Sequence, residues 1–263
     1  MREIVESVRE IAKKIHKKTI DIIGSSKAKE IIGKGEFGDN TVYIDKISED
    51  TILEGLQKIG KCCVLTEEKG IVDFGADYPK FIVDPIDGSL NAKRGIPYYS
   101  ISIGVAFGET IDDIKCGYVV NLATMDEFWA IENEGAFFNG LKIKPNVEDV
   151  KVVAVEGLKK ETADELALKI LKSFYRVRQV GSTALDMCYT AIGAFDAFLH
   201  LDKARIIDYA AAKIIIEESG GGLFEWLEDK KFNDSISLNK SRSFIAVPDK
   251  RLIHKIIKVL KDD

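Results

Sequence analysis

Apolar residues in the first sixty positions recur with the spacing of two amphipathic helices. Isoleucine and valine residues between Ile4 and Ile23 fall mostly on one stripe, which predicts a helix over residues 3–23 that ends at Gly24. A second stripe from Val42 to Leu56 predicts another helix. Short runs rich in β-branched and aromatic residues follow, each bounded by Gly, Pro, Asp or Asn, and they indicate a sheet with antiparallel middle strands. These predicted strands cover residues 63–65, 81–83, 98–107, 116–121 and 126–131.

The second half of the chain alternates between helical and strand patterns. That rhythm is typical of a layered α/β (α+β) fold. A boundary near residues 145–150 predicts two halves: 1–147, an N-terminal α+β half, and 148–263, a C-terminal α/β half. The predicted elements are helices over 162–172, 183–192 and 208–219, strands over 176–180, 195–199 and 243–247, a turn at 220–222 and a closing helix after Pro248.

Charge and composition narrow the classes of function. With 38 Lys and Arg against 43 Asp and Glu, the net charge of −5 argues against nucleic-acid binding. A polyanionic ligand must then be met locally, by metal ions or by a few placed basic side chains. No apolar run reaches the ~20 residues that a bilayer requires, so we expect a cytoplasmic protein with no membrane partner.

The cysteines and histidines exclude two common kinds of site. The four cysteines form no Cys-x-x-Cys pair, and the three histidines are far apart in the sequence. A His/Cys zinc site and a Ser-His-Asp triad are therefore not expected.

A glycine-rich stretch at residues 33–38 matches the spacing Gly-x-Gly-x-x-Gly. A dinucleotide site requires a full strand before this motif and a helix that opens directly after it, and neither pattern is present. We therefore expect a flap, since its glycines lower the cost of rearrangement.

The most informative segment is Asp-Pro-Ile-Asp-Gly-Ser-Leu-Asn at residues 84–91. It follows a predicted strand, so Asp84 lies at a strand end, and the proline and glycine indicate a tight turn. Two carboxylates three residues apart on such a turn can converge on a hard cation, which prefers oxygen ligands. The amides of Gly88 and Ser89 would face an anion if a helix starts there. The alternative is an Asx-type turn selected only for its geometry.

Further acids occupy comparable positions along the chain. Glu67 and Glu68 follow a predicted strand, Asp39 and Asp45 flank the start of the second helix, and Asp208 begins another helix. Each one alone reads as a helix cap or a solvated charge. Together they make a carboxylate-lined site for several metal ions plausible.

These motifs, in this order, resemble the inositol monophosphatase family over nearly the whole chain. The Asp-Pro-Ile-Asp-Gly motif is specific to that superfamily of metal-dependent, lithium-sensitive sugar phosphatases. Gly95-Ile96-Pro97 and the segment 121–124 resemble its archaeal branch, which combines inositol monophosphatase and fructose-1,6-bisphosphatase activity. The resemblance implies an αβαβα sandwich, a homodimer and two to three Mg²⁺ ions.

The same resemblance implies roles for individual residues. Ser89 stands where the family has Thr and would orient the attacking water with Glu67, while Gly88 and Ser89 would hold phosphate oxygens through their amides. Asp39 resembles the position that reaches a third metal through water. Ile207 departs from the Trp that often precedes the last metal ligand, which bears on substrate shape. The implied metal ligands are Glu67, Asp84, the carbonyl of Ile86, Asp87 and Asp208.

We therefore predict a Mg²⁺-dependent, lithium-sensitive phosphomonoesterase that hydrolyses inositol 1-phosphate and fructose 1,6-bisphosphate by direct attack of a metal-activated water. A second phosphate could pair with basic residues near the site. The alternatives are a phosphatase of adenosine 3′,5′-bisphosphate or NADP, and a catalytically idle regulatory protein on this fold. The basic residues predicted to bind substrate are Arg94, Arg178, Lys203 and Arg205.

Composition also suggests a thermophilic source. Charged residues make up 31% of the chain, with many Lys and Glu, while glutamine occurs only at Gln57 and Gln179. This bias matches hyperthermophile proteomes.

Overall fold

The computed structural model describes residues 1–34, 40–158, 165–239 and 241–261. The part described contains seven α-helices and two large sheets. No helix within these ranges is both long and apolar enough to cross a membrane. The helices are α1 (Arg2–Thr19), α2 (Tyr43–Ile59), α3 (Ser89–Arg94), α4 (Glu165–Ser173), α5 (Thr183–Ala191), α6 (Ile206–Ser219) and α7 (Ile253–Lys261).

The first sheet has eight strands, all from the first 142 residues of the chain. Its neighbouring strands pair antiparallel except β3 and β5, which are parallel. In spatial order the strands are β10 (Leu141–Lys142), β9 (Gly135–Phe138), β8 (Glu127–Ile131), β7 (Ile114–Asn121), β6 (Ser100–Ala106), β5 (Lys80–Asp87), β3 (Cys63–Thr66) and β4 (Gly70–Asp73).

The second sheet has five strands from the C-terminal part of the chain. Its centre is mixed, because β11 pairs parallel with β12 and β13 while β15 pairs antiparallel with β13 and β14. The predicted division at residue 147 lies after the last strand of the first sheet and before the first strand of the second sheet. That the two halves are separate domains stays a prediction. In spatial order the strands are β12 (Arg176–Arg178), β11 (Val152–Glu156), β13 (Ala197–His200), β15 (Phe244–Val247) and β14 (Gly222–Glu225).

A small hairpin stands apart from both sheets. Strands β1 (Ile31–Lys34) and β2 (Asn40–Val42) pair antiparallel. Residues 35–39, which include most of the predicted flap and Asp39, lie outside the described residues.

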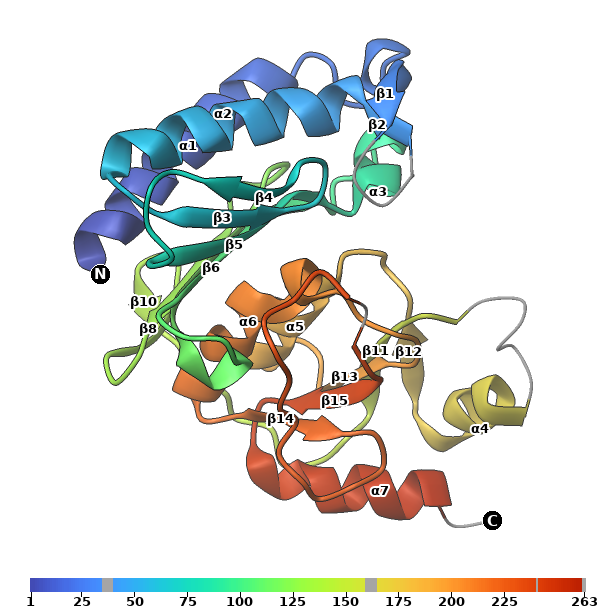
Figure 1. The fold of residues 1–263 in the computed structure, drawn as a ribbon. Coiled ribbons are helices and arrows are strands. Elements are labelled where there is room, and N and C mark those ends of the chain that lie inside the picture. The colour runs from blue at the N-terminus through green and yellow to red at the C-terminus, as the bar shows by residue number, and fades with distance from the viewer. Residues whose placement is uncertain (35–39, 159–164, 240, 262–263) are drawn as a thin grey trace.

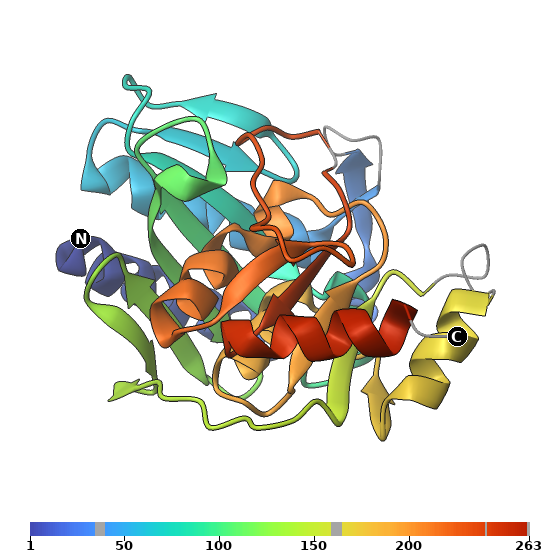
Figure 2. The same cartoon turned by 90° about the horizontal axis from the view of Figure 1, so that it is seen from below.

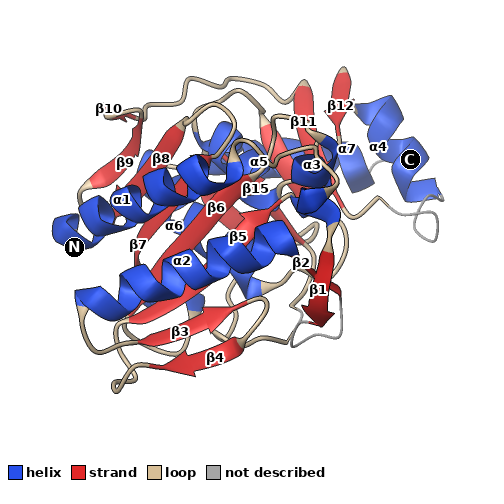
Figure 3. Cartoon of the chain, turned by 90° about the horizontal axis from the view of Figure 1, so that it is seen from above, coloured by secondary structure: helices blue, strands red, loops and turns tan. Residues whose placement is uncertain are grey.

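Helices and sheets stack in five layers (Figure 1). Helices α1 and α2 cover the outer face of the first sheet, as the view from above shows (Figure 3). Helices α5 and α6 lie between the two sheets, and α7 and α4 cover the far side of the second sheet (Figure 2). The predicted αβαβα layered sandwich is confirmed.

Several predicted elements differ from the observed ones. Helix α1 ends at Thr19, four residues before the predicted end, because residues 20–24 turn so that the Gly24 N–H donates to the carbonyl of Ala92. The sequence patterns also did not predict β4, β9, β10, β11 or β14. Three of these strands begin with glycine, β11 begins with an unbroken apolar run and β10 has only two residues, so none of them shows a clear period-two alternation.

Helix α6 packs directly on the backbone of β6 and β7 through two glycines. A Cβ atom added to Gly117 would lie 2.3 Å from the carbonyl oxygen of Ala211, and one added to Gly104 would lie 3.1 Å from the Cβ of Ala210. Small residues on both sides therefore allow this close approach, which places the N-terminal end of α6 relative to the first sheet.

We expect Gly117→Ala to lower the free energy of unfolding by about 1–3 kcal/mol, because overpacking forces the helix or the strand to move. Gly104→Ala is the matched control and should cost less, since its added methyl group would meet Ala210 Cβ at 3.1 Å, a tight contact but a less severe one than the 2.3 Å contact at Gly117. Denaturant unfolding of the three proteins measures the difference. Equal stability of Gly117→Ala and the wild type would contradict this packing account.

Candidate active site

Asp84 and Asp87 lie at the end of β5, where the strand breaks its pairing with β6. The register shifts between these two residues, so both side chains leave the regular alternation of the sheet. Asp84 is buried, and its Oδ1 accepts the Ile86 N–H at 3.0 Å. Its Oδ2 is also buried and has no hydrogen-bond partner among the described residues.

The start of α5 holds the second aspartate. Asp87 Oδ2 accepts the Ala184 N–H at 2.8 Å and the hydroxyl of Ser182 at 2.5 Å. Amides at a helix start suit a carboxylate because they are not used within the helix. This contact commits one oxygen of Asp87 and leaves the other for the centre of the site.

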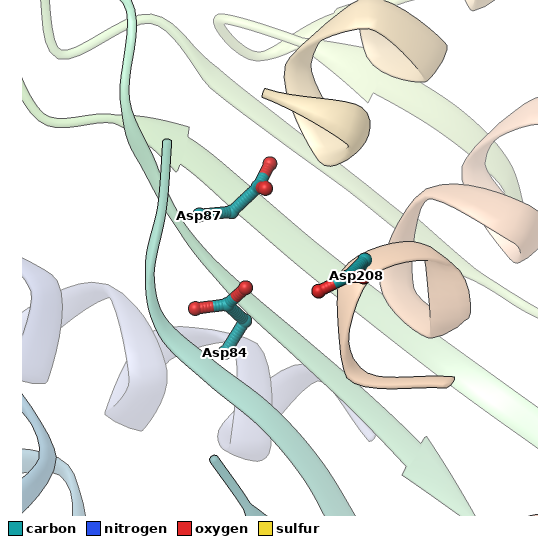
Figure 4. A group of neighbouring side chains, drawn as sticks. All are labelled: Asp84, Asp87 and Asp208. Carbon is teal, nitrogen blue, oxygen red and sulfur yellow. The ribbon is translucent and has the colours of Figure 1, made fainter. Parts of the chain in front are cut away.

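Helix α6 brings the third aspartate to the same place. Asp84, Asp87 and Asp208 each offer one oxygen, and these oxygens lie within 4.8 Å of one another (Figure 4). Residues from the two halves of the sequence therefore converge at one place.

Glu67 reaches the site from the turn between β3 and β4. This turn is tied down by buried Glu49 of α2, whose Oε1 accepts the N–H groups of Glu68 and Lys69 at 3.1 and 3.2 Å. The carboxylate of Glu67 accepts a hydrogen bond from the Arg205 guanidinium, which also contacts Asp208. The surroundings of Glu67 thus include a cation from the second half of the chain.

The electrostatics of the cluster follow from burial and like charges. Burial and the neighbouring charges of Glu67 and Asp87 hold the pKa of Asp84 well above its ordinary value. Burial and Asp208 raise the pKa of Asp87 to about 7. Burial also raises the pKa of Glu67, although Arg205 opposes that shift. These carboxylates repel one another unless a proton or a cation intervenes.

The donor set fits a hard divalent cation. All the converging atoms are carboxylate oxygens, which Mg²⁺ prefers. The unpartnered Oδ2 of buried Asp84 lies in this cluster, and a buried acceptor without a donor is costly unless a cation meets it. The residues present therefore suit the metal that the sequence predicted.

Ser89 has a partner that the sequence analysis did not give. Its Oγ lies 3.0 Å from Asp45 Oδ1 and 2.9 Å from the carbonyl oxygen of Ile86. Burial raises the pKa of Asp45 to about 7, against the opposing charge of Lys93. The sequence signal for a role of Asp45 was its position at a helix start within the recognised motif. Its contact with Ser89 could not be predicted, because the two residues are 44 positions apart.

A cavity of about 220 Å³ adjoins the cluster. Its lining includes Asp87, Asp208, Lys203, Arg205 and His200. Two predicted substrate contacts thus face the cavity.

The other predicted substrate contacts lie elsewhere in the described structure. Arg94, at the end of α3, and Arg178, on edge strand β12, are exposed and are not part of the cavity lining. Gly88 has the positive φ of +90° at the start of α3, and a Cβ there would meet the carbonyl oxygen of Tyr98 at 3.0 Å. The roles of all these residues toward substrate stay predictions.

Comparison with known proteins identifies the family. The model of the inositol monophosphatase family matches residues 3–262. The chain belongs to the inositol monophosphatase family. It is accordingly an enzyme of the phosphatase class, as the sequence analysis predicted.

Relatives of this inositol monophosphatase family member include archaeal enzymes. A fructose-1,6-bisphosphatase/inositol-1-monophosphatase of Methanothermobacter thermautotrophicus is 31% identical, covering 95% of this chain and 94% of the relative. A bifunctional NADP phosphatase/NAD kinase of Methanocaldococcus jannaschii is 35% identical over 92% of this chain, which spans about half of that relative. A solved inositol monophosphatase–fructose 1,6-bisphosphatase superposes with a TM-score of 0.84 at 28% identity, covering 97% of this chain and 98% of its own. The predicted resemblance to the archaeal branch is confirmed.

The raised pKa of Asp87 predicts how stability depends on pH without metal. Because the folded-state pKa of about 7 exceeds the unfolded value of about 3.9, folding favours the protonated carboxyl. Its stabilising contribution is complete below the unfolded pKa and is lost as pH rises toward 7. In EDTA, Asp87→Asn should therefore gain stability relative to the wild type between pH 5 and pH 8, as measured by denaturant unfolding. A stability difference that does not change with pH would contradict the assignment.

Proposed function

We propose that this family member is a Mg²⁺-dependent, lithium-sensitive phosphomonoesterase that hydrolyses inositol 1-phosphate and fructose 1,6-bisphosphate by direct attack of water. The observation that carries the proposal is the convergence of Asp84, Asp87 and Asp208 beside a cavity. The names of the archaeal relatives support the two substrates.

The aspartates would hold the metal ions, with the Ile86 carbonyl, Glu67 and, through water, Asp39 as further predicted ligands. Bound Mg²⁺ would neutralise charge on the phosphoryl oxygens and lower the pKa of an attacking water. No nucleophilic side chain is required, so we expect no phosphoenzyme.

Asp45 and Ser89 can move a proton near the attacking water. The Ser89 hydroxyl lies within hydrogen-bond distance of Asp45 Oδ1, and a carboxyl with a pKa of about 7 can accept a proton at neutral pH. A water that donates to Ser89 Oγ could then lose its proton through the hydroxyl to Asp45. This adds Asp45 to the pair Glu67 and Ser89 that the family resemblance implied.

Substrate recognition would use the cavity beside the metal ligands. Lys203 and Arg205 line it, and the amides of Gly88 and Ser89 stay the predicted contacts for the scissile phosphate. Arg94 and Arg178 could contribute only where a substrate extends beyond this lining.

NADP is the second candidate substrate. Two curated relatives at 30% and 35% identity are bifunctional NADP phosphatase/NAD kinases. Those relatives are about twice as long, and the similarity covers about half of each. We further propose a cytoplasmic homodimer from a thermophilic source, on the strength of the composition and the family resemblance.

EDTA should abolish phosphate release from inositol 1-phosphate, Mg²⁺ should restore it, and Li⁺ should inhibit it.

Asp84→Asn should lower kcat about a hundredfold or more, the range seen when one group that stabilises developing charge is removed. A colorimetric assay of inorganic phosphate measures both effects.

Asp186→Asn is the matched control for this variant. Asp186 is also a buried aspartate with one oxygen that has no partner in the part of the chain that the structure describes, but it lies within α5 and accepts the Tyr98 hydroxyl at 2.7 Å. An asparagine keeps that acceptor, so this variant should retain activity. Near-normal turnover of Asp84→Asn at saturating Mg²⁺ would refute the proposed ligand.

Removal of the Lys203 charge should separate the two proposed substrates. We expect Lys203→Gln to raise KM for fructose 1,6-bisphosphate about tenfold, the worth of one charge-assisted hydrogen bond, and to leave inositol 1-phosphate kinetics nearly unchanged. Steady-state kinetics on both substrates, with NADP as a third, measure the split. A higher kcat/KM for NADP than for either sugar phosphate would favour the second candidate.

A further inference from the structure

The guanidinium of Arg205 spans two of the proposed metal ligands. Its Nη1 donates to Glu67 Oε1, while Nη2 and Nε donate to Asp208 Oδ1 and Oδ2 at 2.8 and 3.2 Å. Both oxygens of Asp208 therefore accept from one side chain. Burial lowers the pKa of Arg205, but the charges of Asp208 and Glu67 outweigh that effect and raise it, so the group stays a cation.

This contact goes beyond what a helix cap requires. Arg205 is the residue before α6, and its backbone N–H already donates to Asp208 Oδ2 at 3.3 Å. The side chain instead extends to Glu67, which lies 138 residues earlier in the chain on the β3–β4 turn. A planar fork of donors matches two carboxylates better than a single ammonium group would.

We propose that Arg205 is an internal counterion that occupies Glu67 and Asp208 in the metal-free enzyme, competes with Mg²⁺ for them and thereby sets the metal affinity. The inference rests on the proposed function, because it concerns the same carboxylates. A divalent cation beside Glu67 and Asp208 meets a fixed positive charge at contact distance, so metal binding requires the guanidinium to withdraw.

The withdrawn side chain stays in the substrate cavity. Arg205 lines that cavity together with Lys203, so a guanidinium released from the two carboxylates faces the place where an anionic substrate enters. Its donors can then pair with phosphate oxygens, which suit the same planar fork. Arg205 is thus a positioning residue that links metal binding to substrate binding.

Titration calorimetry with Mg²⁺ and no substrate tests the competition directly. At pH 8, Arg205→Gln should bind Mg²⁺ about tenfold more tightly, a change that corresponds to about 1.4 kcal/mol. Lys203→Gln is the matched control, since it removes the same charge from the same cavity lining, while within the described residues Lys203 makes no hydrogen bond or ion pair with Glu67 or Asp208. Its Mg²⁺ affinity should change less than twofold. Affinity of Arg205→Gln that equals or falls below that of the wild type would overturn the proposal.

Arg205→Lys is a second test variant, for use if Arg205→Gln folds poorly. It keeps the charge but cannot bridge both carboxylates, so we expect a Mg²⁺ affinity between those of the wild type and Arg205→Gln. Thermal unfolding supplies a second readout. Without the counterion, Arg205→Gln should melt at a lower temperature than the wild type in EDTA and gain more from saturating Mg²⁺; equal gains would count against the proposal.

The outcomes also separate this inference from the proposed function. A wild-type protein that binds no Mg²⁺ would refute both the proposed function and the role of Arg205. A wild type that binds Mg²⁺ and hydrolyses phosphate esters, with an unchanged Mg²⁺ affinity in Arg205→Gln, would remove only the role of Arg205. A rise in KM without tighter metal binding would make Arg205 a simple substrate contact and would likewise overturn the competition.

Discussion

Repulsion among buried carboxylates is the constraint on which this structure depends. Asp84, Asp87 and Asp208 place oxygens within 4.8 Å of one another, an arrangement that the chain would abandon if each side chain were free to turn away. Each is instead fixed from a different direction. The Ile86 amide holds the first, the start of α5 holds the second, and the guanidinium of Arg205 holds the third. The first two aspartates are therefore held by backbone amides that can stay in place when a cation binds, whereas the guanidinium contact is the one that the proposed competition would break.

The layered fold supplies that rigidity. Asp84 and Asp87 end a strand in the middle of the first sheet, while Asp208 begins a helix enclosed between both sheets (Figure 1). Glu67 is held less directly, through a turn whose amides donate to buried Glu49.

Local sequence patterns were sufficient to predict those parts of the site that lie within one turn or one helix start. A strand followed by Asp-Pro-Ile-Asp-Gly places two acids on one turn, and the family resemblance added Asp208 at a helix start. Contacts between residues far apart in the sequence could not be predicted, because nothing near Arg205 in the sequence indicates its contact with Glu67. Glu49 looks like a surface charge of an amphipathic helix, yet it is buried. Strand β11, an interior strand of the second sheet, was missed because its first four residues are an unbroken apolar run without alternation.

The position of α6 has a consequence for how the molecule opens. Residues 206–216 of this helix are all buried, and it contacts β6 and β7 on one side and β14 on the other. A helix enclosed in this way has no solvated face from which to fray, so its central amides can exchange hydrogen with water only when the two sheets separate. We therefore expect the element that carries Asp208 to belong to the last cooperative unit to unfold, and the β3–β4 turn that carries Glu67, which lies near the sheet edge, to open at a lower cost in free energy.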